Sequence, residues 1–290
     1  MKLAFIGFGE AARAFADSLA EQASVEITAA YDVRQVEAMS EACKARGICF
    51  CATPAEAIAG ADWIISAVTA DQSLDAAKAI ADSLLPCQTF IDINSVSPDR
   101  KRETALLVEG KQAGYLDMAV MAPVHPRGHA TPVLIAGKLA QDMATDLQKL
   151  SFKLEIVSQE PGAATAIKMV RSLFVKGLEA LTVETLLAAS VSGCFDRVFS
   201  SLSNSYPGLG WPDVATYNFE RTLQHGARRA AEMRESAATL TALGLTGALA
   251  DRIADVQAAM GGVSATSLSD APLSEAIAEI ARLRLVKREG

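Results

Sequence analysis

The first 160 residues alternate short apolar runs with amphipathic segments. A strand that is buried on both faces has a nearly continuous apolar run, which predicts strands at residues 2–7, 25–32, 48–51, 61–68, 89–94, 115–123, 132–137 and 153–157. Helical spacing predicts helices between them at residues 10–22, 34–47, 73–84, 99–114 and near 138–150. This alternation is typical of an α/β fold with a doubly wound parallel sheet.

The pattern changes after Pro161, and almost no strand signal follows it. Residues 162–192 predict one long helix with a single buried stripe of apolar residues, namely Ala163, Ile167, Val170, Phe174, Leu178 and Leu181. Further helices are expected near residues 195–204, 212–242, 246–260 and 272–286. We therefore predict a Rossmann domain at residues 1–161 and an all-α substrate and dimerisation domain at residues 162–290, which the long helix joins.

Composition and charge exclude several classes of protein. The net charge of −7 argues against a nucleic-acid-binding surface and against an anionic membrane surface as partner. The chain has no run of about 18 apolar residues, so we expect no membrane span. The N-terminus lacks the layout of a signal peptide. The five cysteines show no metal-ligand spacing. We expect no metal site, and we expect reduced thiols in a cytoplasmic protein.

A glycine-rich motif of the form GxGxxA lies between the first predicted strand and the first helix. Its first glycine permits a tight turn, its second lets the backbone approach a pyrophosphate, and its alanine permits close helix–strand packing. The free N–H groups at the start of the helix favour phosphate. The predicted cofactor-binding loop comprises Gly7, Phe8, Gly9, Glu10, Ala11 and Ala12.

An acidic residue, Asp32, ends the second predicted strand. It follows Gly7 by 25 positions, near the spacing of about 20 that is expected of a ribose-binding carboxylate. Such a carboxylate favours NAD, because it binds the 2′-hydroxyl and repels a 2′-phosphate. Arg34 could instead bind a 2′-phosphate, so NADP stays open.

Polar loops follow three of the predicted strands, and ligands of such folds bind beyond the carboxyl ends of the strands. We assign Val68 and Asn94, which end two of these strands, and Thr69, which follows the first of them, to the cofactor site. Asn94 and Ser95 could instead cap the helix that follows Pro98.

The third polar loop, residues 121–129, contains His125 and Arg127. An arginine can hold a substrate carboxylate through two parallel hydrogen bonds. We therefore assign both residues to the binding of a small anionic substrate.

Four segments together resemble the β-hydroxyacid dehydrogenase family, which includes 3-hydroxyisobutyrate and 6-phosphogluconate dehydrogenases. They are GFGEAA (7–12), DINSVSP (92–98), DMAVMAPVHPRG (117–128) and GAATAIKM (162–169). The resemblance covers about residues 1–193. The rest of the chain resembles the helical domain of a less characterised phosphogluconate-dehydrogenase-like subgroup. The resemblance implies hydride transfer between a nicotinamide and a small β-hydroxy acid, or a related alcohol or aldehyde.

The resemblance also implies roles for individual residues. Lys168 matches the lysine that transfers the proton of the substrate hydroxyl, and Ser95 matches a substrate-binding serine or threonine. Three positions depart from the family's pattern, because Ala164 replaces a glycine, Ser172 an asparagine and His125 a serine. The departures leave the chemistry in place and the substrate open.

Helical spacing places Arg171 and Ser172 on the face of Lys168. Positive charge or desolvation lowers the pKa of a lysine, so Arg171 could prepare Lys168 for proton transfer, and Ser172 could bind the substrate. The alternative for Lys168 is a lysine at the edge of the buried stripe whose ammonium reaches water.

A polar cluster shares one face of a later helix, and it consists of His225, Arg228, Arg229 and Glu232. It would either close the substrate pocket or form a solvated or intersubunit face with ion pairs.

Two other functions stay open. The chain could be an imine or pyrroline-carboxylate-type reductase, since these enzymes also join a glycine-rich Rossmann start to a helical dimerisation domain. It could also be a non-catalytic NAD-binding protein. The alanine-rich, apolar second half predicts a homodimer or a higher homo-oligomer.

Overall fold

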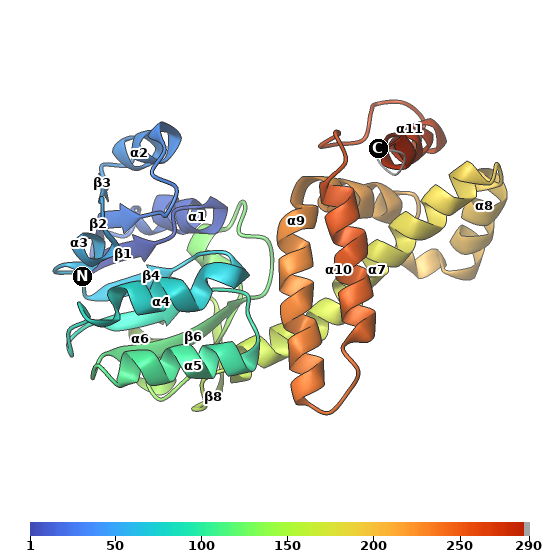
Figure 1. Ribbon diagram of the computed structural model, residues 1–290. Coiled ribbons are helices and arrows are strands. Elements are labelled where there is room, and N and C mark those ends of the chain that lie inside the picture. The colour runs from blue at the N-terminus through green and yellow to red at the C-terminus, as the bar shows by residue number, and fades with distance from the viewer. Residues whose placement is uncertain (287–290) are drawn as a thin grey trace. The chain divides into compact units, whose positions relative to one another are not determined.

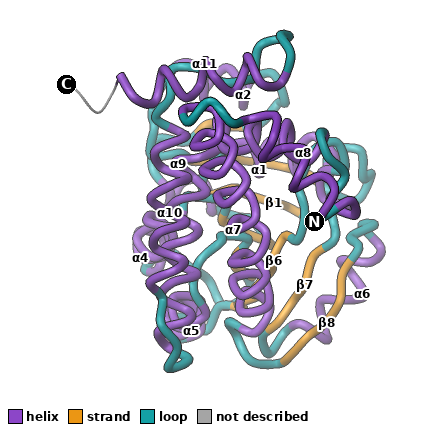
Figure 2. Tube along the Cα trace, turned by 90° about the vertical axis from the view of Figure 1, so that its right-hand side faces the viewer, coloured by secondary structure: helices purple, strands orange, loops and turns teal. Residues whose placement is uncertain are grey.

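The computed structural model describes residues 1–286, and the chain divides into two compact units. The first unit is Met1–Met169 and the second begins at Val170. One helix, α7 (Ala163–Val191), runs through the boundary between them without a break (Figure 2). The domain boundary after residue 161 stays a prediction.

An eight-stranded sheet forms the centre of the first unit, in the order β3-β2-β1-β4-β5-β6-β7-β8. The strands are β1 (Lys2–Ile6), β2 (Glu26–Tyr31), β3 (Cys49–Phe50), β4 (Trp63–Ser66), β5 (Thr89–Asp92), β6 (Gly114–Val120), β7 (Val133–Ala136) and β8 (Leu154–Ser158). The prediction of a doubly wound α/β domain is confirmed.

The prediction of a parallel sheet is wrong for one pair of neighbours. β6 and β7 are antiparallel, whereas the other neighbouring strands pair in parallel. The segment between them contains one short 3₁₀ turn, η2 (Gly128–Ala130), and no α-helix. A parallel return normally requires a helical crossover, so the chain turns back antiparallel instead.

Helices cover both faces of this sheet (Figure 1). Successive residues of β1 enter different cores, since Leu3 and Phe5 pack with α1 and α6 whereas Ala4 and Ile6 pack with α3, α4 and α5. The α-helices that precede α7 are α1 (Glu10–Leu19), α2 (Glu37–Lys44), α3 (Pro54–Ile58), α4 (Ser73–Ala81), α5 (Pro98–Glu109) and α6 (Ala140–Lys149). The short helix α3 was not predicted, although its capping box, formed by Thr53 and Glu56, is a sequence signal.

The second unit is all α-helical, as predicted. After α7 come α8 (Phe195–Ser205), α9 (Asp213–Ala242), α10 (Ala248–Gly261) and α11 (Leu273–Val286). α9 and α10 lie side by side (Figure 1). They approach so closely that a Cβ at Gly226 would lie 2.3 Å from the carbonyl oxygen of Gln257, which explains the glycine.

The predicted apolar stripe of α7 is not the face that is buried. Phe174 and Leu181 are 74% and 66% exposed, and Ile167 and Val170 are exposed as well. The buried face carries many polar residues, among them Thr165, Ser172, Lys176, Glu179 and Thr182. The prediction failed because neighbouring elements supply hydrogen-bond and ionic partners to these side chains, and periodicity alone cannot show such partners.

Among the helices of residues 1–286, none is long and apolar enough to cross a membrane.

Candidate functional site

The glycine loop between β1 and α1 is closed by Gly7. Its φ angle is +84°, and its N–H donates to the carbonyl oxygen of Tyr31 over 2.8 Å. A Cβ at this position would lie 2.6 Å from the carbonyl oxygen of Ala67, so a larger residue would displace the neighbouring strand end. Ala12 is fully buried against the sheet, whereas Glu10 is exposed and Ala11 is half-buried.

The start of α1 has room for a ligand. Gly9 is the N-cap residue, and no side chain accepts a hydrogen bond there. A Cβ added to Gly9 would have no atom within 4 Å, so the space beside the loop is open. Free N–H groups at a helix start bind phosphate well, so the loop fits the pyrophosphate of a dinucleotide.

Asp32 is buried beneath this loop. One carboxylate oxygen accepts a hydrogen bond from the N–H of Phe8 over 2.9 Å. The other accepts from the N–H of Arg34 over 2.9 Å and from its Nε over 3.3 Å. The carboxylate therefore ties the glycine loop to the end of β2, a structural role that the sequence did not reveal. The guanidinium of Arg34 is largely exposed.

The ends of β4 and β5 are joined by Asn94. Its Oδ1 accepts from the N–H of Val68 over 2.7 Å, and its Nδ2 donates to the hydroxyl of Ser66 over 2.9 Å. Neither Asn94 nor Ser95 caps α5, because the N-cap residue of that helix is Ser97. The capping alternative is therefore wrong. Thr69 is exposed, and its side chain hydrogen-bonds Asp71 and lowers the pKa of that carboxyl.

Ser95 and Lys168 are in direct contact. The Nζ of Lys168 donates to the hydroxyl oxygen of Ser95 over 2.6 Å, and the lysine is half-buried. The two residues lie 73 positions apart in the sequence. This contact brings together two of the residues that the family resemblance had singled out.

The first turn of α7 is fixed to the sheet by Asp117 of β6. One of its carboxylate oxygens accepts from the N–H groups of Gly162 and Thr165 over 3.0 and 3.3 Å. The hydroxyl of Thr165 donates to the carbonyl oxygen of Val96 over 2.6 Å. The helix that carries Lys168 is therefore anchored beside the loop that carries Ser95.

His125 and Arg127 are both exposed in the loop after β6. Neither of them takes part in the hydrogen bond between Ser95 and Lys168. The loop is attached to the sheet domain through the neighbouring His129, whose Nε2 donates to the carbonyl oxygen of Leu150 over 2.7 Å. Its Nδ1 lies 2.8 Å from the hydroxyl of Ser18 on α1. The sequence prediction had missed this residue.

Burial lowers the pKa of His129 below its usual value of 6.5. The folded state therefore favours the neutral ring, and its contribution to stability is complete above the unfolded pKa. We expect the melting temperature to fall by a few degrees as the pH falls below about 6.5. His129→Gln should flatten this part of the pH profile, and His125→Gln, a change at an exposed histidine, should not. A profile that is unchanged in His129→Gln would refute the assignment.

In the second unit, Arg171 is exposed and Ser172 is buried. The hydroxyl of Ser172 accepts from the Nζ of Lys176 over 3.3 Å, and Lys176 pairs with Glu232 over 2.7 Å. Arg228 also pairs with Glu232, over 3.1 Å.

A second buried ion pair joins Arg229 to Glu179 over 2.8 Å, and Gln257 donates to the same carboxylate over 3.1 Å. Arg229 and Glu232 are buried, so the interpretation of their helix face as solvated is wrong for both residues.

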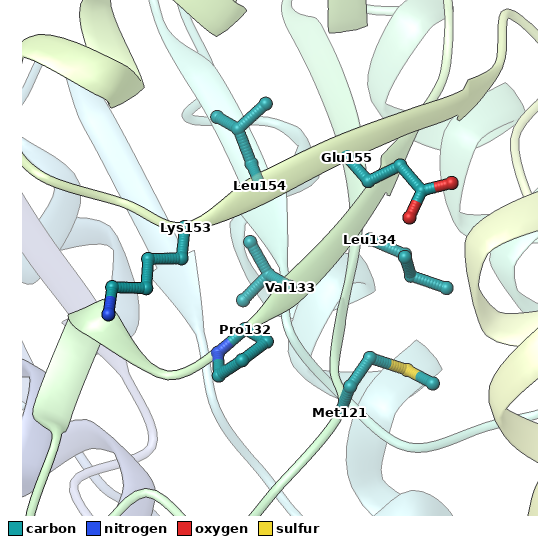
Figure 3. Close-up of a pocket in the computed structure, with 7 residues that line it drawn as sticks. All are labelled: Met121, Pro132, Val133, Leu134, Lys153, Leu154 and Glu155. Atoms are coloured by element: carbon teal, nitrogen blue, oxygen red, sulfur yellow. The ribbon is translucent and has the colours of Figure 1, made fainter.

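An open hollow of about 300 Å³ lies at the β7–β8 edge (Figure 3). Met121, Pro132, Val133, Leu134, Lys153, Leu154 and Glu155 line it. None of these is a predicted site residue. The part of the chain that the structure covers contains no cluster of acidic, histidine and cysteine side chains that could hold a metal ion.

Two family models match the chain. Residues 2–143 match the NAD binding domain of 6-phosphogluconate dehydrogenase. Residues 189–260 match a domain of unknown function (DUF1932). The first match covers the glycine loop, Asp32, Asn94 and Ser95, and the second covers most of α9 and α10.

Solved structures match most of the chain. A conserved hypothetical protein from Sinorhizobium meliloti 1021 is 35% identical, with 98% of this chain and 96% of that chain covered and a TM-score of 0.73. The 3-hydroxyisobutyrate dehydrogenase of Mycobacterium tuberculosis, solved with L-serine, is 17% identical, with 99% of each chain covered and a TM-score of 0.72. An imine reductase from Myxococcus stipitatus in complex with NADP⁺ is 20% identical, with 89% and 93% covered and a TM-score of 0.57.

The last two likenesses are distant and show a shared fold alone. The predicted family resemblance and the predicted NAD-binding domain are confirmed by the family models. The relative from Sinorhizobium meliloti matches nearly the whole chain. The chain belongs to the family in which the NAD-binding domain of 6-phosphogluconate dehydrogenase is followed by this helical domain of unknown function.

Proposed function

We propose that the protein is an NAD(P)-dependent oxidoreductase that interconverts a small β-hydroxy acid and its carbonyl form. The single observation that carries the proposal is the hydrogen bond between Lys168 and Ser95, over 2.6 Å. It lies at the carboxyl edge of a sheet whose neighbouring strand ends form the dinucleotide loop. A site of this class needs a nucleotide site, a substrate anchor and a proton-transfer group together.

In this proposal, Lys168 takes the proton of the substrate hydroxyl during oxidation and returns it during reduction. Ser95 holds the same hydroxyl oxygen and keeps the lysine amine directed toward it. When bound, the nicotinamide accepts or donates the hydride. Gly7, Gly9 and the first turn of α1 would hold the pyrophosphate, and Asp32 the adenine ribose. His125 and Arg127 are proposed as anchors of the substrate carboxylate because they are exposed and polar.

The second candidate is an imine reductase. Its support is the fold shared with the imine reductase from Myxococcus stipitatus. Reduction of an imine delivers hydride to the carbon and a proton to the nitrogen, so an ammonium donor such as Lys168 would also serve it. The presence of a serine beside the lysine favours a hydroxyl substrate, since Ser95 can both donate to and accept from a hydroxyl oxygen.

The proposal is tested by following the absorbance of NADH and NADPH with a panel of substrates. The panel contains short β-hydroxy acids with the oxidised cofactors, and cyclic imines with the reduced ones. We expect substrate-dependent formation of reduced cofactor with a β-hydroxy acid. Turnover of cyclic imines alone would favour the second candidate. Tight cofactor binding without turnover on either class would support a non-catalytic NAD-binding protein.

In this proposal, Asp32 favours the binding of NAD(H), and Arg34 favours the binding of NADP(H). We expect Asp32→Ala to weaken NADH binding at least about tenfold, since it loses the 2′-hydroxyl contact and the acceptor for the N–H of Phe8. Arg34→Ala should weaken NADPH binding more than NADH binding. Fluorescence titration measures both affinities, and Glu37→Ala, a change at an exposed acid of α2, is the control. Unchanged affinity for both cofactors in Asp32→Ala would contradict the assignment.

The expected homodimer also stays a prediction. The exposed apolar residues of α7 are a surface that such a dimer could bury.

A further inference from the structure

A lysine that is completely buried, Lys101, lies on α5 between two carboxylates. Its Nζ is 3.0 Å from a carboxylate oxygen of Asp92 and 3.3 Å from one of Asp117. It also donates to the carbonyl oxygen of Asp92 over 2.6 Å. The ammonium therefore has one hydrogen bond and two ion-pair contacts, and a fully buried lysine normally requires such partners.

The two carboxylates belong to the two segments that carry the candidate site. Asp92 ends β5 and accepts from the N–H of Asn94 over 3.0 Å, so it holds the loop of Ser95. Asp117 accepts from the first turn of α7 and so holds the helix of Lys168. The ammonium of Lys101 is thus a bridge between the loop and the helix.

The charge balance shows what the ammonium contributes to the two carboxylates. Burial raises the pKa of Asp117, and Lys101 opposes that rise. The hydroxyl of Tyr115 donates to Asp92 over 3.0 Å, and the helix start of α7 adds N–H donors at Asp117. One buried cation therefore serves two buried carboxylates. Without the cation, the two carboxylates would repel each other and push the loop of Ser95 away from α7.

We propose that Lys101 is a positioning residue that sets the contact between Ser95 and Lys168. It touches neither substrate nor cofactor in this account. Its effect on turnover rests on the proposed function, but its effect on the contact does not. The two can therefore be tested separately.

The test measures how fast the amine of Lys168 reacts with sulfosuccinimidyl acetate, with the site identified by peptide mass spectrometry. The reaction is run on the full chain in four forms: wild type, Ser95→Ala, Lys101→Met and the double variant. We expect Ser95→Ala and Lys101→Met each to raise the rate at Lys168 about tenfold, the equivalent of one charged hydrogen bond. In the Ser95→Ala background, Lys101→Met should change the rate by less than about twofold, because the contact is already gone.

The labelling rate of Lys149, an exposed lysine, is read in the same digests as a control. An unchanged rate at Lys168 in Lys101→Met would overturn the proposal. So would fold-changes that multiply in the double variant, since these indicate general loosening and not a shared contact.

A double substitution separates the loss of the ammonium bridge from misfolding. Lys101→Met combined with Asp117→Asn removes one positive and one negative charge, so the net buried charge is unchanged. The amide oxygen of the new side chain can still accept from the start of α7. We expect this variant to fold and bind NADH, and still to label faster at Lys168. A rate equal to that of wild type would show that the ammonium bridge does not set the contact.

Turnover of the best β-hydroxy acid of the panel adds the functional readout. Lys101→Met should lower kcat about 10- to 100-fold while the KM for the cofactor changes little, and the loss should nearly vanish in the Ser95→Ala background. If Lys168→Ala leaves turnover unchanged, the proposed function is wrong and the labelling rates still decide the role of Lys101. If Lys168→Ala abolishes turnover but the labelling effects multiply, the role of Lys101 alone is wrong.

Discussion

Replacement of Lys168 by alanine lowers the turnover of a β-hydroxy acid by about 10²- to 10⁴-fold in our account, the usual contribution of a positioned proton-transfer group. Cofactor binding should be nearly unchanged, because the glycine loop and Asp32 do not depend on Lys168. The loss should therefore appear in kcat, and NADH affinity measured by fluorescence should stay within a few-fold of wild type.

The matched control for this variant is Lys153→Ala, which removes an exposed lysine at the β7–β8 hollow. Its turnover should equal that of wild type. Ser95→Ala should lower kcat less than Lys168→Ala does, since the amine remains but loses the hydroxyl that directs it. Turnover of Lys168→Ala within a few-fold of wild type would refute the assignment.

Arg229→Met destabilises the second unit by about 3–5 kcal/mol, which is the usual cost of removing one partner of a buried ion pair. Burial raises the pKa of Glu179 and lowers that of Arg229, so each charge depends on the other. Without the guanidinium, the carboxylate of Glu179 keeps the hydrogen bond from Gln257 of α10 and the weaker influence of the cations Lys176 and Arg221. It must then stay charged without a partner or take up a proton.

Urea unfolding followed by circular dichroism measures this loss. The double variant Arg229→Met with Glu179→Leu removes both charges and should recover much of the stability. Arg252→Ala breaks an exposed ion pair with Asp255 on α10 and should cost well under about 1 kcal/mol. An unfolding midpoint of Arg229→Met equal to that of Arg252→Ala would contradict the account.

Most of the fold could be predicted because the sheet domain is built on strong local patterns. Apolar runs between helical segments identified seven of the eight strand positions within about two residues at each end. The eighth, β6 (Gly114–Val120), ends three residues before its predicted end at residue 123. The antiparallel β7 could not be predicted, since the residue pattern of a buried strand does not depend on its direction. The buried face of α7 could not be predicted either, because its partners lie far away in the sequence.

The candidate site could be predicted where a residue is part of a recognisable motif. Gly7, Asp32, Ser95 and Lys168 were singled out in this way. The residues that hold them were missed. Asp117 lies within the apolar run of β6, and Lys101 lies in a charged segment that resembles a solvated helix start. Whether such a charge is exposed or buried depends on tertiary contacts, so the positioning network became visible only in the structure.

Chemical rescue of Lys168→Ala tests the central claim most directly. The variant lacks the amine but keeps the space it occupied, so a small primary amine in solution can replace it. The measurement is the rate of NADH formation from a β-hydroxy acid at increasing concentrations of ethylamine, with Ser95 intact. If Lys168 transfers the proton, the rate should rise with the concentration of unprotonated amine, and wild type should show no such rise. A variant whose rate is already close to that of wild type and does not respond to ethylamine would contradict the claim.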